Sequence, residues 1–248
     1  FNTCSAHVVS NLLEYFYMRG HGTSMQTSRL FLYKVAKNFL EREDDPGTYI
    51  RQVMGVLRAI GSPPEKFWPY LDPGTFEEPN REDERINTEP TAFCYAVASD
   101  FEALHAYRLD RLDEPNTDRL MIRAKAHLAA ELPFAFGIPL YASIQDKDTK
   151  KTGRIKFPGE GETPVGNHAI VAMGYDDRIV IPVSGSETET TTGAFLIQNS
   201  WSEKWGDEGF GWVPYKYLEE GMAKDFWTLI DAEWPNFEES DLHLEDPE

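Results

Sequence analysis

The sequence predicts an α+β protein with a helical first part and a strand-rich second part. Apolar residues recur at helical spacing through much of the first hundred residues. Beyond them, short apolar or alternating runs are separated by Gly, Pro and Asp, which is typical of strands. Because helices and strands are segregated along the chain, we expect two lobes, residues 1–99 and 100–248, with a site in the cleft between them. An acidic tail is expected from about residue 232.

The first predicted helix begins close to the amino end. Asn2 or Thr3 can cap it, so that Cys4 lies in its first turn, and Gly20 or Gly22 ends it. Its apolar residues recur at helical spacing, at Val8, Val9, Leu12, Leu13 and Phe16. Two more helices are expected at residues 28–40 and 48–59, the latter ended by Gly61 and two prolines.

The middle of the chain changes in character. Residues 72–90 are rich in Pro, Gly and charged residues and are predicted to form a long surface loop. Helices are expected at residues 91–98 and 118–131. Strands are expected at residues 104–109, 134–144, 168–175, 194–199, 211–214 and 227–231, with 184–192 as a loop between two of them.

Composition excludes several classes of partner and cofactor. The chain has 248 residues and a formal charge of −18, which disfavours nucleic acid and anionic membranes. It has no apolar run near the ~18 to 20 residues that span a bilayer. Metal-ligand spacing of the CxxC or HxxxH kind is absent, so we expect neither a metal nor another cofactor. Asp44 and Asp45 lack a calcium-loop pattern, and the acidic segments are best explained as solvated loops.

The two cysteines limit the disulfides that can form, and the start of the chain suggests processing. Cys4 and Cys94 allow at most one disulfide, and if Cys4 is catalytic, Cys94 is expected to be a buried core thiol. The start, Phe1-Asn2-Thr3-Cys4, has neither an initiator Met nor a basic-then-apolar leader. We therefore expect a processed form. A cytoplasmic location and export after processing both stay open.

Three polar residues suggest a nucleophilic site. Cys4 lies at a predicted helix start, where a thiolate is favoured. His168 and Asn199 each lie in or beside an apolar strand. Such a histidine can activate the thiol, and the asparagine can orient its far ring nitrogen. Trp201, two residues on in the same expected strand, can shield that contact from water. The set indicates a thiol hydrolase.

Two segments resemble a known family. Asn199-Ser200-Trp201, followed by Trp205-Gly206-Asp207-Glu208-Gly209-Phe210, resembles the "NSWG…WGExGY" segment of papain-like cysteine peptidases, and residues 167–175 (NHAIVAMGY) resemble their "NHAVxxVGY" segment. Cys4-Ser5-Ala6 resembles the segment of the catalytic Cys more loosely. Weaker similarities occur at residues 47–61, 68–70 and 132–136. The sequence is most similar to the bacterial, disulfide-poor branch.

This resemblance implies a fold and a set of roles. The fold is a papain-like pair of lobes, one helical and one an antiparallel β-barrel-like lobe, with the active site in the cleft between them. Cys4 would be the nucleophile, His168 the general base and then acid, and Asn199 the orienting residue. Peptide bonds would be hydrolysed through a thioester acyl-enzyme. Substrate-binding or pocket-forming roles are implied for Thr48, Tyr49, Ile50, Phe136 and Asn167, and a supporting role for Trp201.

Departures from the family pattern keep other functions open. Asn2-Thr3 precede Cys4 where the family has Gly-Ser, and Ser5 follows it where the family has Trp. The family's oxyanion-hole Gln lies six residues before the Cys, and this sequence starts three before it. We expect that Gln on a preceding segment, or else a weak or inactive relative. A removed inhibitory propeptide or upstream segment is a further expected partner, beside a peptide or protein substrate.

Three functions thus remain. The first is a papain-like endopeptidase. The second is an acyl or amide transferase that uses the same thioester with a different acceptor. The third is a catalytically silent module that binds peptides or a protein in the cleft. Retention of Cys4, His168 and Asn199 favours the first.

Overall fold

The structure is a computed structural model that describes residues 2–41, 47–70, 86–101, 105–111 and 117–230. The expected acidic tail, and most of the loop expected at residues 72–90, lie outside the described residues. Helices of the described chain are α1 (Cys4–His21), α2 (Arg29–Phe39), α3 (Ile50–Ala59), α5 (Ala92–Ala98), α6 (Thr117–Ala129), α7 (Lys147–Thr152) and α8 (Lys216–Glu219). Short 3₁₀ helices are η1 (Glu65–Phe67), η3 (Ser99–Phe101) and η4 (Ala142–Gln145).

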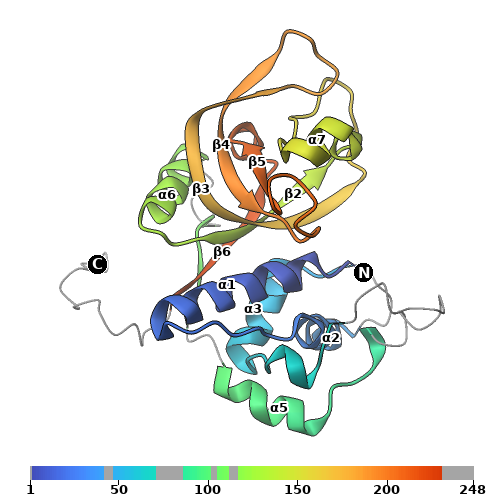
Figure 1. The fold of residues 1–248 in the computed structure, drawn as a ribbon, viewed down its shortest axis with the longest axis vertical. Coiled ribbons are helices and arrows are strands. Elements are labelled where there is room, and N and C mark those ends of the chain that lie inside the picture. Colours follow the sequence, from blue (N-terminus) through green and yellow to red (C-terminus); the bar gives the residue numbers. More distant parts are fainter. Residues whose placement is uncertain (1, 42–46, 71–85, 102–104, 112–116, 231–248) are drawn as a thin grey trace.

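The strands of the described chain form a six-stranded sheet in the order β1-β6-β2-β3-β4-β5, in which neighbours are antiparallel. They are β1 (His105–Arg108), β2 (Phe134–Leu140), β3 (Gly166–Pro182), β4 (Thr190–Gln198), β5 (Phe210–Pro214) and β6 (Lys224–Ile230). Figure 1 shows the two lobes of this α+β fold, with α1, α2, α3 and α5 below the curved sheet.

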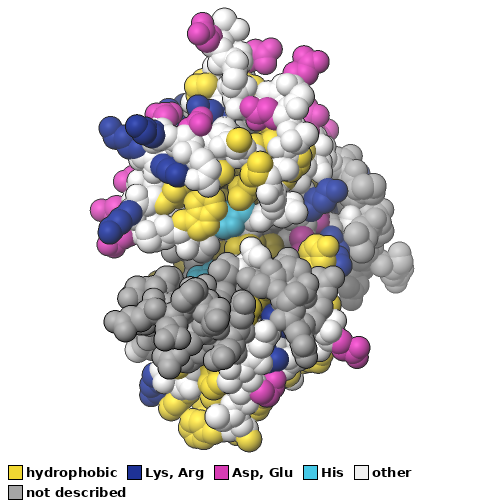
Figure 2. All heavy atoms as spheres, turned by 90° about the vertical axis from the view of Figure 1, so that its right-hand side faces the viewer, with side chains coloured by type: hydrophobic (Ala, Val, Ile, Leu, Met, Phe, Trp, Pro, Cys, Tyr) yellow, Lys and Arg dark blue, Asp and Glu magenta, His cyan; other side chains and the backbone are white. Residues whose placement is uncertain are grey.

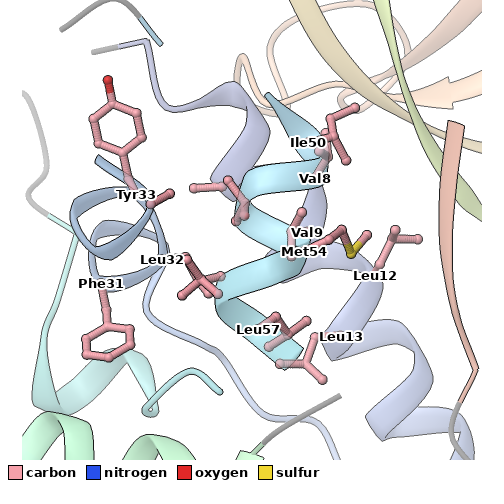
Figure 3. Close-up of a cluster of buried hydrophobic side chains, with 14 of the residues drawn as sticks. Val8, Val9, Leu12, Leu13, Phe31, Leu32, Tyr33, Ile50, Met54 and Leu57 are labelled. Atoms are coloured by element: carbon pink, nitrogen blue, oxygen red, sulfur yellow. The ribbon is translucent and has the colours of Figure 1, made fainter. Parts of the chain in front are cut away.

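The helical lobe has its own apolar core. Val9 and Leu13 of α1 lie beside Met54 and Leu57 of α3, and Leu32 of α2 approaches α3 from the other side (Figure 3). All five side chains are buried. This stripe on α1 is the one that the sequence predicts, because residues four apart share one face of a helix.

Strand β3 contributes side chains to the cores of both lobes. Ala169 and Val171 belong to the core of the helical lobe, whereas Ile170 and Ala172 belong to the core on the other face of the sheet. Successive side chains of a strand point to opposite faces, so an uninterrupted apolar run is needed where both faces are covered. The long helix α1 packs along β3 at this point. One strand of the sheet is therefore fixed directly against the helix that carries Cys4.

Several element boundaries differ from those expected. Thr3 takes the N-cap position of α1, but its side chain caps nothing: Thr3 Oγ1 lies 2.9 Å from Tyr70 Oη. Strand β2 ends at Leu140, and η4 follows it. Strand β3 continues to Pro182, and β4 begins at Thr190, so the loop expected at residues 184–192 is shorter. At the other end of α1, Gly22 takes a left-handed conformation with a φ of 68°, as a helix stop requires.

Candidate active site

A cleft of about 560 Å³ lies between the helical lobe and the sheet. The helical lobe contributes the residues just before and within α1 and those at the start of α3, and the sheet contributes parts of β2, β3 and β6. In chain order the lining residues are Asn2, Cys4, Gly47, Thr48, Tyr49, Ile50, Gly137, Ile138, Pro139, Gly166, Asn167, His168, Ala169, Met222, Lys224 and Asp225. Figure 2 shows this hollow, with hydrophobic and histidine side chains at its floor.

Cys4 is the first residue of α1 and is half-buried in the cleft wall. The following residues Ser5 and Ala6 are fully buried, which anchors the first turn in the lobe. The first backbone N–H groups of a helix have no partner within it and carry the positive end of its dipole. Cys4 therefore lies where a negative charge is stabilised.

His168 lies on β3 opposite Ile138 of β2 and faces the same cleft. Its Nε2 is 2.8 Å from Oδ1 of Asn199, just beyond the end of β4. The N–H of Ser200 donates to the same oxygen at 2.8 Å. Because that oxygen receives a backbone N–H, it acts as an acceptor, and Nε2 of His168 is the ring atom that carries hydrogen. This leaves Nδ1 as the ring nitrogen available for chemistry.

The surroundings of His168 are nearly dry. His168 and Asn199 expose 5% and 7% of their surfaces. The indole of Trp201 stacks on the imidazole, with ring centroids 4.7 Å apart. Burial lowers the pKa of His168, and the hydrogen bond with Asn199 opposes that shift. Trp201 itself lies in a turn after β4, not in the strand that the sequence predicts, because β4 ends at Gln198.

Four of the residues expected to bind substrate line this cleft, and one does not. Thr48, Tyr49 and Ile50 lie on one wall, and Asn167 lies beside His168 on the other. Phe136 is outside the lining, and the pocket role expected for it is corrected. Its ring is buried in the core of the sheet lobe, stacked on Phe226 at 5.1 Å. Position 136 shares a face of β2 with the lining residue Ile138 but lies one pleat farther from the cleft, opposite Ile170.

Two hydrogen bonds fix the first residues of the chain, one to the segment at Thr48 and one within the first turn of α1. Ser5 Oγ lies 2.6 Å from Thr48 Oγ1, which ties the wall at Thr48 to α1. His7 Nδ1 lies 3.0 Å from the carbonyl oxygen of Thr3, and its ring meets Tyr70 edge-on at 5.0 Å. Burial lowers the pKa of His7 to about 4. The turn around Cys4 is thus held by groups that no motif indicates.

The sequence reasoning missed the contribution of the start of β6 and the residues before it. Met222, just before β6, and Lys224 and Asp225, its first two residues, line the cleft because Lys224 pairs with Gly137 of β2, one strand away from His168. No spacing signal in the sequence could have found them, because the contact arises from strand pairing between distant segments. Among the described residues no group of three His, Cys, Asp or Glu side chains could hold a metal ion. No described helix is long and apolar enough to cross a membrane.

Comparison with known proteins places the chain beside one family of enzymes. Residues 121–227 match the model of the papain family cysteine proteases. An uncharacterized peptidase C1-like protein of Acanthamoeba polyphaga mimivirus is 26% identical over 249 residues, which covers 97% of this chain and 72% of that protein.

Two solved structures extend the comparison. Xylellain, a cysteine protease from Xylella fastidiosa, has a TM-score of 0.72 and 27% identity, with 93% of this chain and 80% of that chain covered. Bromelain from Ananas comosus shares the fold, with a TM-score of 0.59 and 16% identity over 93% of this chain and 89% of that chain. The similar proteins include a viral and a bacterial one, so the bacterial branch that the sequence suggested is not established. The chain is therefore similar to papain-like cysteine peptidases, in sequence over residues 121–227 and in its fold.

Proposed function

We propose that the chain is a cysteine endopeptidase in which Cys4 is the nucleophile, His168 the acid and base, and Asn199 the orienting residue. The observation that carries this proposal is the cleft itself, whose lining contains both Cys4 and His168 although they come from different lobes. The hydrogen bond from His168 to Asn199 directs the imidazole, and a protein or peptide is the substrate.

The reaction follows from this arrangement. His168 accepts the thiol proton of Cys4, and the thiolate sulfur attacks the carbonyl carbon of the scissile peptide. The negative oxygen that develops is stabilised by backbone N–H groups in the first turn of α1. His168 then protonates the leaving amine as the C–N bond breaks, which leaves a thioester on Cys4. Water, deprotonated by His168, attacks the thioester, and the carboxylic acid product leaves as the thiol is restored.

Labelling with an epoxysuccinyl thiol inhibitor at neutral pH tests the nucleophile. We expect one equivalent on Cys4, located by intact and peptide mass, and much slower labelling in His168→Ala. Cys94 is 1% exposed and serves as an internal control that stays unmodified. If Cys4 reacts no faster than a free thiol, the peptidase mechanism is wrong for this chain.

A second experiment tests the reaction class. Peptides acetylated at the amino end and amidated at the carboxyl end should be cut internally, and Cys4→Ser should leave them intact. Added amine should not replace water in the products. A dominant amide product would indicate a transferase that uses the same thioester, and labelling of Cys4 without any turnover would indicate a binding module.

A further inference from the structure

The start of strand β6 forms one end of the cleft. Lys224 and Asp225, its first two residues, both line the cleft. The register between β2 and β6 shifts between Ala135 and Gly137, where Lys224 takes its place opposite Gly137. Such an irregularity redirects the side chains beside it. Asp225 has a φ of 61°, which is rare for a residue with a side chain and costs about 1 to 3 kcal/mol.

The half-buried carboxylate of Asp110 holds this irregular segment in place. Asp110 accepts hydrogen bonds from the backbone N–H of Asp225 and of Phe226, both at 3.0 Å. The guanidinium of Arg108 pairs with the same carboxylate, with Nε 2.8 Å from Oδ1. Four hydrogen bonds reach this carboxylate, two from Arg108 and two from the backbone of β6, so the fold defines the position of Lys224 at the cleft.

The carboxylate of Asp225 is already engaged by protein groups. Its Oδ1 accepts from the indole Nε1–H of Trp227 at 2.7 Å, and its Oδ2 accepts from the backbone N–H of Arg51 at 3.3 Å. Arg51 lies in the first turn of α3, where the helix dipole also favours a negative charge. Asp225 therefore joins the two lobes, and its carboxylate is held by neutral N–H donors and not by Lys224.

Two cations, Lys224 in the cleft lining and Arg51 beside it, form no ion pair among the described residues. Lys224 is exposed and forms no ion pair there. The guanidinium of Arg51 lies 4.8 Å over the ring of Tyr49, another lining residue, and pairs with no carboxylate of the described chain. Basic side chains are visible beside one end of the hollow in Figure 2, together with an acidic one. With Asp225 counted, Lys224 and Arg51 still leave one excess positive charge here, in a chain of net charge −18.

We propose that this end of the cleft is a subsite for an acidic side chain of the substrate, with glutamate preferred and Lys224 as the residue that selects it. The inference rests on the peptidase function proposed above and names its substrate class. Ile50, Ile138 and Met222 line the same cleft and can pack against the methylene groups of a glutamate. The carboxylate at the tip then meets the ammonium of Lys224, with Arg51 adding to the positive field.

A capped peptide library tests the subsite. Each position is fixed in turn as Glu or Gln, and cleavage is followed by mass spectrometry. At one position relative to the cut bond, Glu should be favoured over Gln by about fivefold, which is the size of an exposed ion pair. High salt should reduce the ratio because it screens exposed charges. Lys224→Glu should reverse the preference at that position alone, and the matched variant Lys147→Glu, which changes an exposed lysine outside the cleft, should leave it unchanged.

Binding to a catalytically dead variant separates the two proposals. Cys4→Ala should retain Glu peptides over Gln peptides at the same position, and the double variant with Lys224→Glu should not. Selective retention without any cleavage by the wild type would contradict the peptidase mechanism and support the subsite. A Glu-to-Gln ratio near one at every position, or a preference that Lys224→Glu leaves unchanged, would overturn the subsite.

Discussion

The imidazole of His168 is fixed by one hydrogen bond, 2.8 Å from its Nε2 to Oδ1 of Asn199. Both residues are almost fully buried, so no water replaces that bond when it is lost. We expect Asn199→Ala to lower kcat by between about fivefold and 150-fold, which corresponds to about 1 to 3 kcal/mol for a buried hydrogen bond. KM should change little, because Asn199 is not part of the cleft lining.

Asn199→Gln and Asn199→Asp serve as comparisons for this prediction. Gln has the same amide on a longer stem and should recover little activity. Asp keeps the acceptor oxygen and adds a negative charge, so it should raise the pKa of His168 and recover more activity. Steady-state kinetics on a capped peptide measures all three, and an unchanged kcat in Asn199→Ala would show that Asn199 does not orient the imidazole.

Trp201 shields the imidazole of His168 from water. Its ring stacks on His168 at 4.7 Å, and burial is the main cause of the lowered pKa of His168. Trp201→Ala admits water, so the pKa of His168 should rise toward its ordinary value. An NMR titration of His168 in a Cys4→Ala background measures this without the thiol. Trp201→Phe keeps an aromatic cover and should shift the pKa less, whereas identical titrations would mean that Trp201 does not exclude water.

His7 makes stability depend on pH. Burial is the main cause that lowers its pKa to about 4, and the charges of Arg29 and His168 add to it, against the bond to the Thr3 carbonyl. Between pH 6.5 and about 4 the unfolded chain thus binds more protons at this residue than the folded one, and stability falls as the pH falls. From pH 7.5 to pH 5 this contributes a loss of about 2 kcal/mol.

Urea unfolding at the two pH values measures that loss. His7→Gln should reduce the difference between them by about 2 kcal/mol, whatever it does to stability at pH 7.5. His105→Gln removes an exposed histidine of β1 and is the matched control, whose difference should stay close to that of the wild type. Equal pH dependence in the wild type and His7→Gln would contradict the assignment.

The sequence predicts the elements that carry the proposed chemistry better than those that shape the cleft. Helix α1 and strands β3 and β4 are marked by apolar periodicity beside a polar residue, and all three are present. The extension of β3 through Asp176, Asp177 and Arg178 was not predicted, because charged residues interrupt its alternation. The charge of Asp177 has partners on other elements: its carboxylate accepts hydrogen bonds from Lys125 at 2.7 Å and from Tyr215 at 2.8 Å.

Distance along a strand explains the misplaced pocket residue. Phe136 and Ile138 share one face of β2 and one core cluster, so apolar composition does not tell which of them reaches the cleft. Ile138 pairs with His168 and lines the cleft, whereas Phe136 pairs with Ile170, farther along the strand, and lies in the core. Lys224 could not be found at all from the sequence, because only the pairing of β6 with β2 brings it to the site.

Thr48 couples the cleft wall to the helix of the nucleophile. Its Oγ1 lies 2.6 Å from Oγ of the fully buried Ser5. Thr48→Val keeps the shape and removes the hydroxyl, so it should raise KM by about fivefold, the equivalent of about 1 kcal/mol, with little change in kcat. Thr48→Ser keeps the hydroxyl and should behave like the wild type. In a double-mutant cycle, Ser5→Ala should add little to Thr48→Val, and full additivity would contradict the coupling.

Two glycines have the same backbone conformation but different surroundings, so substituting each by alanine distinguishes the cost of a steric clash from the cost of backbone strain. Gly206 and Gly221 have φ values of 65° and 66°, so an alanine at either is strained by about 1 kcal/mol. At Gly206 the added methyl group would also collide with the carbonyl oxygen of Phe210 and lie 3.1 Å from Cα of Gly153, whereas nothing lies within 4 Å at Gly221. Backbone atoms cannot turn aside as a flexible side chain does. Gly206→Ala should therefore lower the free energy of unfolding by about 3 kcal/mol or more, and Gly221→Ala by about 1 kcal/mol. Urea unfolding measures both, and equal losses would show that the contact between the segments at Gly153 and Gly206 is looser than the structure describes.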